Sequence, residues 1–244
     1  MLSMHLFIIS WEGQHEKAIS IAKSIFSATN QISIVYSDPN SDLTLDVDCQ
    51  CIRRPNELFW GDKFKACLDV CDSDLMVVIH ADCDCEDWSF LVHKCRSAMD
   101  QNPIIAVWAP LIDWTQWNIH RTRLYEIRST SFTVVAQTDA IVFCLSKAAM
   151  NRLRRAKFEG NVYGWGIDTM AVAYAYANGM LAVVDKSVRV NHPKSRGYPS
   201  EAALAQCNEF LKQLTLNESI QNRLLWSFIS AQSAQIAAAQ GQHD

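Results

Sequence analysis

The 244-residue sequence has no excess of basic charge, no recognisable signal peptide and no apolar run long enough to cross a membrane. Its formal net charge is −4, from 22 Lys and Arg against 26 Asp and Glu. The charge balance therefore provides no electrostatic reason to expect a nucleic acid as partner. The first ten residues are too short for a signal peptide and lack its basic segment. We expect a cytoplasmic protein without a transmembrane segment.

Zinc-binding spacings, internal repeats and linkers are also missing from the sequence. The two Cys-x-Cys pairs, at 49–51 and 83–85, lack the two-residue gap of zinc knuckles. The nine cysteines are scattered, which indicates reduced thiols rather than a disulfide framework. Hydrophobic residues make up 49% of the chain and charged residues 20%, as in a globular protein with a sizeable core. We predict one domain over 1–244, with a core at about 4–195 and a C-terminal helical extension at about 200–239.

Apolar periodicity predicts alternating strands and helices along the chain. The predicted strands are residues 5–10, 31–36, 49–53, 75–79, 104–108, 133–135, 140–145, 181–184 and 188–190. The predicted helices are residues 15–27, 60–70, 88–99, 147–154, 168–178, 201–214 and 219–239, with a loop at 195–200. No clean period emerges at 110–127. This order indicates an α/β fold with one Rossmann-like, mostly parallel sheet, helices on its faces and further helices at the C-terminus.

The chain is organised around a buried strand at 75–79 that stops abruptly at acidic residues. Ligands of open α/β sheets bind in a crevice beyond the carboxyl ends of the strands. Asp82 and Asp84 would stand at the mouth of this crevice. In an extended segment their side chains point the same way. Two carboxylates on one side suit Mn²⁺ or Mg²⁺ at a diphosphate site. The alternative is a solvated turn in which Asp87 caps the helix that begins at Trp88.

Two further segments carry polar groups at the ends of elements. Gly164-Trp165-Gly166-Ile167-Asp168 is a glycine-rich loop that opens a helix. Its glycines let the backbone bend closely around a ligand, and Trp165 offers a face for a sugar. Asn191-His192-Pro193 ends a late strand. Asp168 could instead be a simple helix cap. His192 could instead be a structural residue at the end of the strand.

These three segments, in this order, resemble those of glycosyltransferases with the GT-A fold, nearest to the family 2 group and related small bacterial enzymes. The resemblance covers roughly residues 4–195 and rests on Ala81-Asp82-Cys83-Asp84, the 164–168 loop and His192. It departs from the family at His80, where relatives often have Asp. It departs again at Thr169, because relatives often show Glu-Asp where this chain has one acid followed by threonine.

The resemblance implies an inverting glycosyltransferase, of the hexosyltransferase type, that uses a nucleoside-diphosphate sugar donor and a glycan or other hydroxyl acceptor. By resemblance Asp82, Asp84 and His192 would hold Mn²⁺ or Mg²⁺, which stabilises charge on the leaving diphosphate. Asp168 would be the base, since a hydroxyl at neutral pH needs a group that takes its proton. We expect the helix N-terminus to lower the pKa of Asp168. Whether His80 also binds the metal stays open.

The resemblance also implies contacts with the donor from Ser10, Glu12, Asp38, Lys65, Asp82 and Trp165. Asp38 could equally be a turn residue before Pro39, and Lys65 could belong to a solvated helix face. The aromatic and basic side chains at 114–121 could line the acceptor side or simply pack in the core.

Two other functions stay open from the sequence. A sugar-phosphate nucleotidyltransferase can share this kind of sheet and metal site. It would normally have a glycine-rich, basic loop after the first strand, and residues 10–15, Ser-Trp-Glu-Gly-Gln-His, are not one. A non-catalytic protein that binds nucleotides or carbohydrates could also keep the scaffold.

Overall fold

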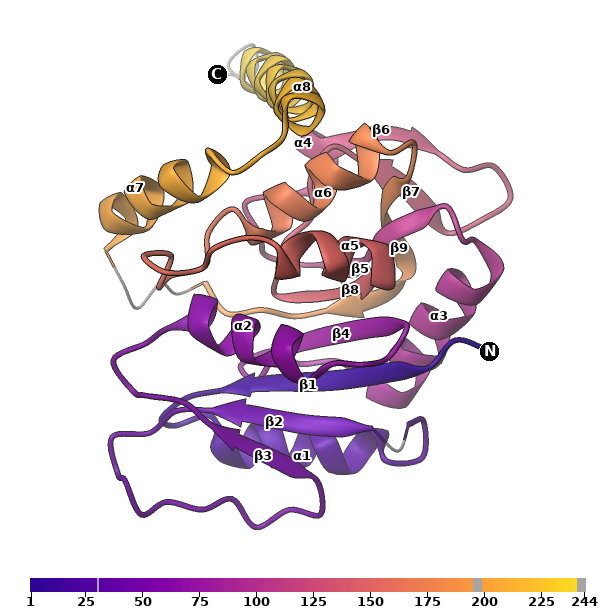
Figure 1. The fold of residues 1–244 in the computed structure, drawn as a ribbon. Helices are drawn as coiled ribbons and strands as arrows, with labels where there is room; N and C mark the ends of the chain where they lie inside the picture. Colours follow the sequence, from indigo (N-terminus) through magenta and orange to yellow (C-terminus); the bar gives the residue numbers. More distant parts are fainter. Residues whose placement is uncertain (30, 195–198, 241–244) are drawn as a thin grey trace.

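The structure is a computed structural model that describes residues 1–29, 31–194 and 199–240. Most of the loop expected at 195–200, and with it the expected end of the core at 195, lies outside the described residues. The fold is built on one mixed, mostly parallel sheet with helices on both faces (Figure 1).

The sheet places its strands in the order β3-β2-β1-β4-β8-β5-β9-β7-β6. Strands β3, β2, β1 and β4 are parallel to one another, and β8 runs antiparallel to both β4 and β5. Strand β9 is parallel to β5, whereas β7 and β6 close the sheet as antiparallel strands. The strands are β1 (Met4–Ser10), β2 (Ile32–Tyr36), β3 (Gln50–Arg53), β4 (Leu75–His80), β5 (Ile105–Ile112), β6 (Arg123–Glu126), β7 (Phe132–Val135), β8 (Val142–Ser146) and β9 (Leu181–Val190).

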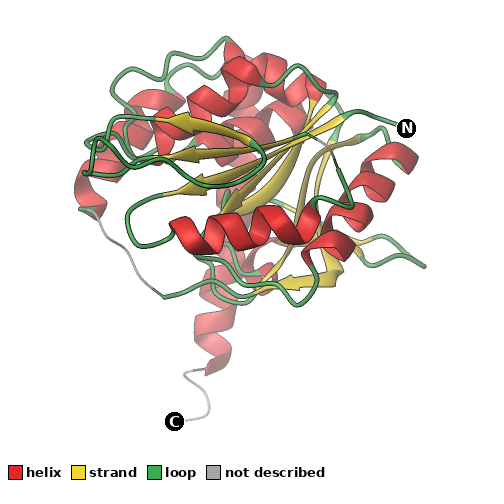
Figure 2. Cartoon of the chain, turned by 90° about the horizontal axis from the view of Figure 1, so that it is seen from below, coloured by secondary structure: helices red, strands yellow, loops and turns green. Residues whose placement is uncertain are grey.

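The helices divide between the two faces of the sheet (Figures 1 and 2). They are α1 (His15–Ile25), α2 (Trp60–Val70), α3 (Trp88–Gln101), α4 (Ile119–Thr122), α5 (Lys147–Arg154), α6 (Ile167–Ala177), α7 (Ser200–Leu211) and α8 (Leu216–Gln240). Buried side chains of α1 and α3 belong to the core on one face. Those of α2, α5 and α6 belong to the core on the other, together with residues of α7 and α8.

The strand period of two assigns side chains to these two cores. In β1, Leu6 and Ile8 face the α1–α3 side, whereas Phe7 and Ile9 face the α2–α5–α6 side. All four are fully buried, as a parallel strand covered on both faces requires. This double burial explains why the N-terminal strands appear in the sequence as unbroken apolar runs.

Two features of the second half of the sheet differ from the sequence-based expectation. The strands expected at 181–184 and 188–190 form one strand, β9, whose pairing with β5 passes through an irregularity between Asp185 and Arg189. Asp185 is buried there, and its Oδ1 accepts hydrogen bonds from the Ser131 hydroxyl (2.6 Å) and the Ser187 amide (2.9 Å). Helix α4 and strand β6, each four residues long, were not predicted, because residues 110–127 show no clean apolar period.

The last two helices, α7 and α8, lie away from the edge of the sheet that β3 forms (Figure 1). The end of α8 extends beyond the rest of the domain (Figure 2). A buried ion pair anchors α8, with Arg152 Nε on α5 lying 2.6 Å from Glu218 Oε1. Among the residues that the structure describes, no helix has the length and apolar character that a bilayer span requires.

Candidate metal and nucleotide site

The sheet topology brings the ends of β4 and β9 to the same edge. Strands β4 and β5 both pair antiparallel with β8, so they run in the same direction, and β9 is parallel to β5. His80 is the last residue of β4, and His192 follows the last residue of β9 by two positions. Residues that lie 112 positions apart in the chain therefore meet beyond the carboxyl ends of these strands.

A backbone bridge fixes the two segments against each other. The amide of Asp84 donates to the carbonyl of Asn191 at 2.9 Å, and the amide of Asn191 donates back to the carbonyl of Asp84 at 2.8 Å. The bridge places His192 beside the turn that follows β4. As a result, His192 Nε2 lies 3.5 Å from Asp82 Oδ2.

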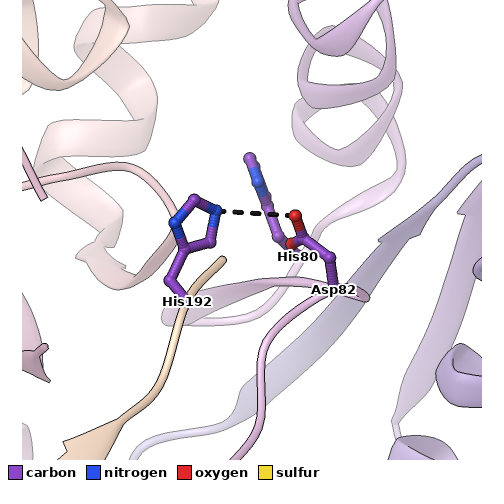
Figure 3. Close-up of side chains that lie close together, drawn as sticks. All are labelled: His80, Asp82 and His192. Carbon is purple, nitrogen blue, oxygen red and sulfur yellow. Dashed lines mark ion pairs between the residues drawn. The ribbon is translucent and has the colours of Figure 1, made fainter. Parts of the chain in front are cut away.

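His80, Asp82 and His192 form a compact group of potential metal ligands (Figure 3). One ligand atom from each lies within 4.8 Å of the others. The side chains of Asp82 and His192 are mostly buried, with 15% and 11% of their surfaces exposed. Among the described residues, His80 Nε2 and His192 Nδ1 are buried without a hydrogen-bond partner. Unpaired buried nitrogens are costly unless a ligand satisfies them.

The electrostatics keep His80 and Asp82 in forms that bind a cation. Burial lowers the pKa of His80 to about 4, so its imidazole is neutral at pH 7. Burial also raises the pKa of the Asp82 carboxyl, but the hydrogen bond to His192 and the nearby imidazoles outweigh it, so this pKa lies below its usual value. A neutral imidazole and an ionised carboxylate are the forms that coordinate divalent metals.

Asp84 does not join this group. The chain turns after β4, with the Cys83 amide donating to the His80 carbonyl at 3.2 Å, so Asp82 and Asp84 do not lie on one extended segment as the sequence suggested. Asp84 instead lies 2.8 Å from Lys17 Nζ of α1, and its side chain is 68% exposed. Its role as a metal ligand stays a prediction. Asp87 caps α3 as expected, accepting from the Phe90 amide at 2.8 Å.

Asp168 lies in the first turn of α6, after Gly166 at φ 90°. Its Oδ1 accepts a hydrogen bond from the Thr169 amide at 2.8 Å. Burial, followed by repulsion from Asp139, raises the pKa of Asp168 to about 7. The expectation that the helix N-terminus would lower this pKa is therefore wrong, because desolvation and a second carboxylate outweigh the helix dipole. A carboxyl with this pKa is well suited to accept a proton near neutral pH.

Asp139 connects Asp168 electrostatically with the metal-ligand group. Burial raises the pKa of Asp139, whereas a hydrogen bond from the Thr115 hydroxyl and the charge of His192 lower it. Its carboxylate in turn raises the pKa of Asp168. The sequence did not single out Asp139, since it precedes a strand without any recognisable motif.

The glycine-rich loop before α6 packs tightly on α2. A Cβ on Gly61 would lie 2.0 Å from the Asn161 carbonyl oxygen, and the Gly61 amide donates to the Val162 carbonyl at 2.9 Å. Gly164, at φ 73°, lies against the ring of Trp60. Trp165 is half-buried in this loop. The loop that leads to Asp168 is therefore held by backbone contacts that only glycines permit.

Ser10 and Asp38, both predicted to frame the nucleoside, are linked through a residue that the sequence did not single out. His15 Nδ1 lies 2.8 Å from the Ser10 hydroxyl, and His15 Nε2 lies 2.9 Å from Asp38 Oδ2. The other oxygen of Asp38 accepts from the Asn40 amide at 2.8 Å, and this bond, followed by the one to His15, lowers the pKa of Asp38. This relay, the hydrogen-bonded chain from Ser10 through His15 to Asp38, fixes the orientation of polar side chains at the ends of β1 and β2.

The two remaining predicted donor contacts are more exposed. Glu12 lies exposed in the turn after β1. Lys65 pairs with Asp69 on its own helix, with Nζ 2.7 Å from Asp69 Oδ2. Lys63, two residues earlier on α2, is the buried lysine, and its Nζ donates to the Leu58 carbonyl at 2.9 Å.

The region at 110–127 contacts the C-terminal helix. The Trp117 ring lies 5.2 Å from that of Trp226 in an edge-on arrangement, and Arg121 Nε donates to the Ser233 hydroxyl at 2.9 Å. For these two residues, packing against α8 is the observed role.

No protein-family model matches the chain, and no curated protein matches it in sequence. Solved structures do match it in fold. One is GalNAc-T7 with UDP, GalNAc and Mn²⁺, at a TM-score of 0.61 and 12% identity over 82% of this chain and 45% of that one. Another is the mannosyltransferase PcManGT from Pyrobaculum calidifontis with GDP-Man and Mn²⁺. It matches with a TM-score of 0.61 and 12% identity over 98% of this chain and 76% of that one.

A nucleotidyltransferase also matches. CMP:2-keto-3-deoxy-manno-octonic acid synthetase with CTP has a TM-score of 0.50 and 9% identity, over 87% of this chain and all of that one. This chain spans less than half the length of the GalNAc-T7 chain. At these identities the comparisons establish the fold, which is GT-A-like, as the sequence predicted.

Proposed function

We propose that this protein is a glycosyltransferase that moves a sugar from a nucleoside-diphosphate sugar to an acceptor hydroxyl, with inversion at the anomeric carbon. The observation that carries the proposal is the pairing of two sites on one GT-A-like scaffold. One is the group of His80, Asp82 and His192, which suits a divalent cation. The other is Asp168, a carboxyl with a pKa of about 7, electrostatically coupled to it through Asp139.

Asp82 and His192 would hold the divalent ion, Mn²⁺ or Mg²⁺, with Asp84 as a further predicted ligand. His192 Nε2, which lies 3.5 Å from Asp82 Oδ2, and the ionised Asp82 fit such an ion. When bound, the ion supplies charge stabilisation to the leaving diphosphate. Matched structures that contain both Mn²⁺ and a nucleotide or nucleotide sugar support this assignment.

Asp168 would accept the proton of the acceptor hydroxyl as that oxygen attacks the anomeric carbon. In a single direct displacement the bond from sugar to diphosphate breaks as the new glycosidic bond forms, so the configuration inverts. The raised pKa makes Asp168 a stronger base than an ordinary aspartate. Trp165, three residues earlier, would offer its ring to the sugar.

The ends of β1 and β2 would hold the nucleoside, through Ser10, Glu12 and Asp38, with Lys65 and Asp82 as further predicted donor contacts. The relay from Ser10 through His15 to Asp38 supports this role, since it orients a carboxylate at the sheet edge. The turn after β1, residues 10–15, has neither the glycine content nor the basic charge expected for triphosphate binding in a nucleotidyltransferase. A glycosyltransferase is therefore favoured over that second candidate.

A panel of nucleotides should separate the remaining functions. We expect nucleoside-diphosphate sugars to raise the melting temperature in Mn²⁺ more than in a chelator, because the ion and the diphosphate bind together. Incubation with the stabilising donor and candidate acceptors should then release nucleoside diphosphate. Release of pyrophosphate from a nucleoside triphosphate would instead identify a nucleotidyltransferase. A thermal shift without any turnover would identify a binding protein.

The rate of transfer should depend on pH through Asp168. The base must be deprotonated to accept a proton, so turnover should fall as the pH drops below the pKa of about 7. The expected slope is about tenfold per pH unit on the acid side, with a plateau above it. The measurement is turnover at saturating donor from about pH 5.5 to 8.5, with donor affinity determined at each pH as the control. A flat profile across this range would contradict the assignment of Asp168.

A further inference from the structure

The candidate metal site contains two imidazoles and one carboxylate. An oxygen-only metal site at a diphosphate would need carboxylates where this chain has His80 and His192. We propose that His80 is a metal ligand, and that the site therefore prefers Co²⁺, Fe²⁺ and Zn²⁺ to Mg²⁺. This inference rests on the proposed function, in which a divalent ion binds at Asp82 and His192, and it adds His80 as a ligand and the class of ion.

Strand geometry directs His80 toward α2 rather than into solvent. In β4, Met76 and Val78 face the α2 side of the sheet, and the strand period of two continues this side to His80. The imidazole lies 5.7 Å from the Trp60 ring and 6.0 Å from the Trp11 ring. The two aromatic rings restrict how the imidazole can turn, which is the kind of support that orients a metal ligand.

One ring nitrogen of His80 is already desolvated. Nε2 of His80 is buried and, among the described residues, has no hydrogen-bond partner. The ring lies within the group whose ligand atoms are mutually within 4.8 Å, together with Asp82 and His192 (Figure 3). A purely structural histidine at the end of a strand would normally satisfy this nitrogen with water or a protein group. A bound metal ion would satisfy it.

The two histidines arrive from separate strands but are held in fixed register. The paired hydrogen bonds between Asp84 and Asn191, at 2.9 and 2.8 Å, join the segment after β4 to the segment after β9. Asp82 and His192 lie within two residues of this bridge, and His80 lies four residues before Asp84. The site is therefore largely formed by the backbone, which favours the ion that fits its donors over one that requires rearrangement.

The donor set determines which ion that is. Mg²⁺ prefers oxygen ligands in octahedral geometry and dehydrates reluctantly. Imidazole suits Fe²⁺, Co²⁺ and Zn²⁺, whose affinity for nitrogen donors exceeds that of Mn²⁺ and far exceeds that of Mg²⁺. Two imidazoles with one carboxylate and open positions is an arrangement that nitrogen-preferring ions occupy. Mn²⁺, which accepts both donor types, is expected to bind with intermediate affinity.

The test is metal binding by the chelator-treated full-length protein, without nucleotide. Calorimetric titration with MgCl₂, MnCl₂ and CoCl₂ should give a Co²⁺ affinity about 10²-fold or more above that for Mg²⁺. Bound Co²⁺ should show visible absorption bands shifted and intensified relative to the aqueous ion, as imidazole coordination produces. Equal affinities for Co²⁺ and Mg²⁺, or an aqueous-type Co²⁺ spectrum, would overturn the proposal.

Variants at position 80 identify the ligand. His80→Asp should lower Co²⁺ affinity at least about tenfold and raise Mg²⁺ affinity. The ratio of Co²⁺ affinity to Mg²⁺ affinity should therefore fall. His80→Gln should lower Co²⁺ affinity without helping Mg²⁺, and thermal unfolding without metal checks that both variants fold. His93→Asp, on an exposed position of α3, is the matched control and should change neither value. If His80→Gln binds Co²⁺ as tightly as the parent protein, His80 is not a metal ligand.

These results are separable from the proposed function. If the metal preference is as expected but no donor is turned over, the ion site stands and the glycosyltransferase assignment fails. If His80 variants keep parent-like metal binding while sugar transfer occurs, the transferase assignment stands and His80 is not a ligand.

Discussion

Replacing Asp168 by asparagine should reduce the rate of sugar transfer by about 10²–10⁴-fold, while donor affinity changes by no more than a few fold. Asparagine preserves the size of the side chain and can still accept from the Thr169 amide, which Asp168 does at 2.8 Å. It cannot accept the proton of an acceptor hydroxyl. The chemical step should therefore be lost, while the folded structure and the donor site are kept.

Three roles for Asp168 have different outcomes in this experiment. A helix cap would lose little rate, because Asn caps about as well as Asp. A metal ligand would lose donor binding together with rate, whereas a base loses rate alone. Asp87→Asn is the matched control, since Asp87 caps α3 through the Phe90 amide and should tolerate asparagine. Near-parent turnover by Asp168→Asn, or a product that keeps the donor's anomeric configuration, would refute the proposed mechanism.

Replacing Asp82 by asparagine should remove the gain in nucleoside-diphosphate affinity that Mn²⁺ gives, and lower turnover by about 10²-fold or more. An amide neutralises the only carboxylate in the group formed with His80 and His192. The remaining imidazoles carry no negative charge to offset the ion. Affinity in the presence of a chelator should change little, and that comparison isolates the contribution of the metal.

Asp84→Asn is the paired variant, because the sequence assigned both acids to the ion. Asp84 is 68% exposed and pairs with Lys17 outside the compact group, so we expect its loss to be the smaller of the two. Calorimetry with a nucleoside diphosphate, with and without Mn²⁺, provides the comparison. A larger loss for Asp84→Asn than for Asp82→Asn would reverse this ranking. If both variants bind the nucleoside diphosphate in Mn²⁺ with unchanged affinity, neither Asp82 nor Asp84 is a metal ligand.

Sequence patterns located most of the helices and strands, and they identified polar residues at the ends of these elements. Double burial of parallel strands produces unbroken apolar runs, which is why the strand at β4 and the acid after it were recognisable. Helical periodicity located α6 and placed Asp168 in its first turn. Such signals depend on residues within a few positions of one another, so a sequence displays them directly.

Which groups meet, and how they ionise, depends on the tertiary structure. His80 and His192 come together because of strand order, and Asp84 is separated from Asp82 by a turn. The pKa of Asp168 rises because it is buried near Asp139, which outweighs the local helix dipole that the sequence suggested. Desolvation and repulsion between carboxylates depend on distances in space, between residues far apart in the chain, and no local pattern of residues encodes those distances.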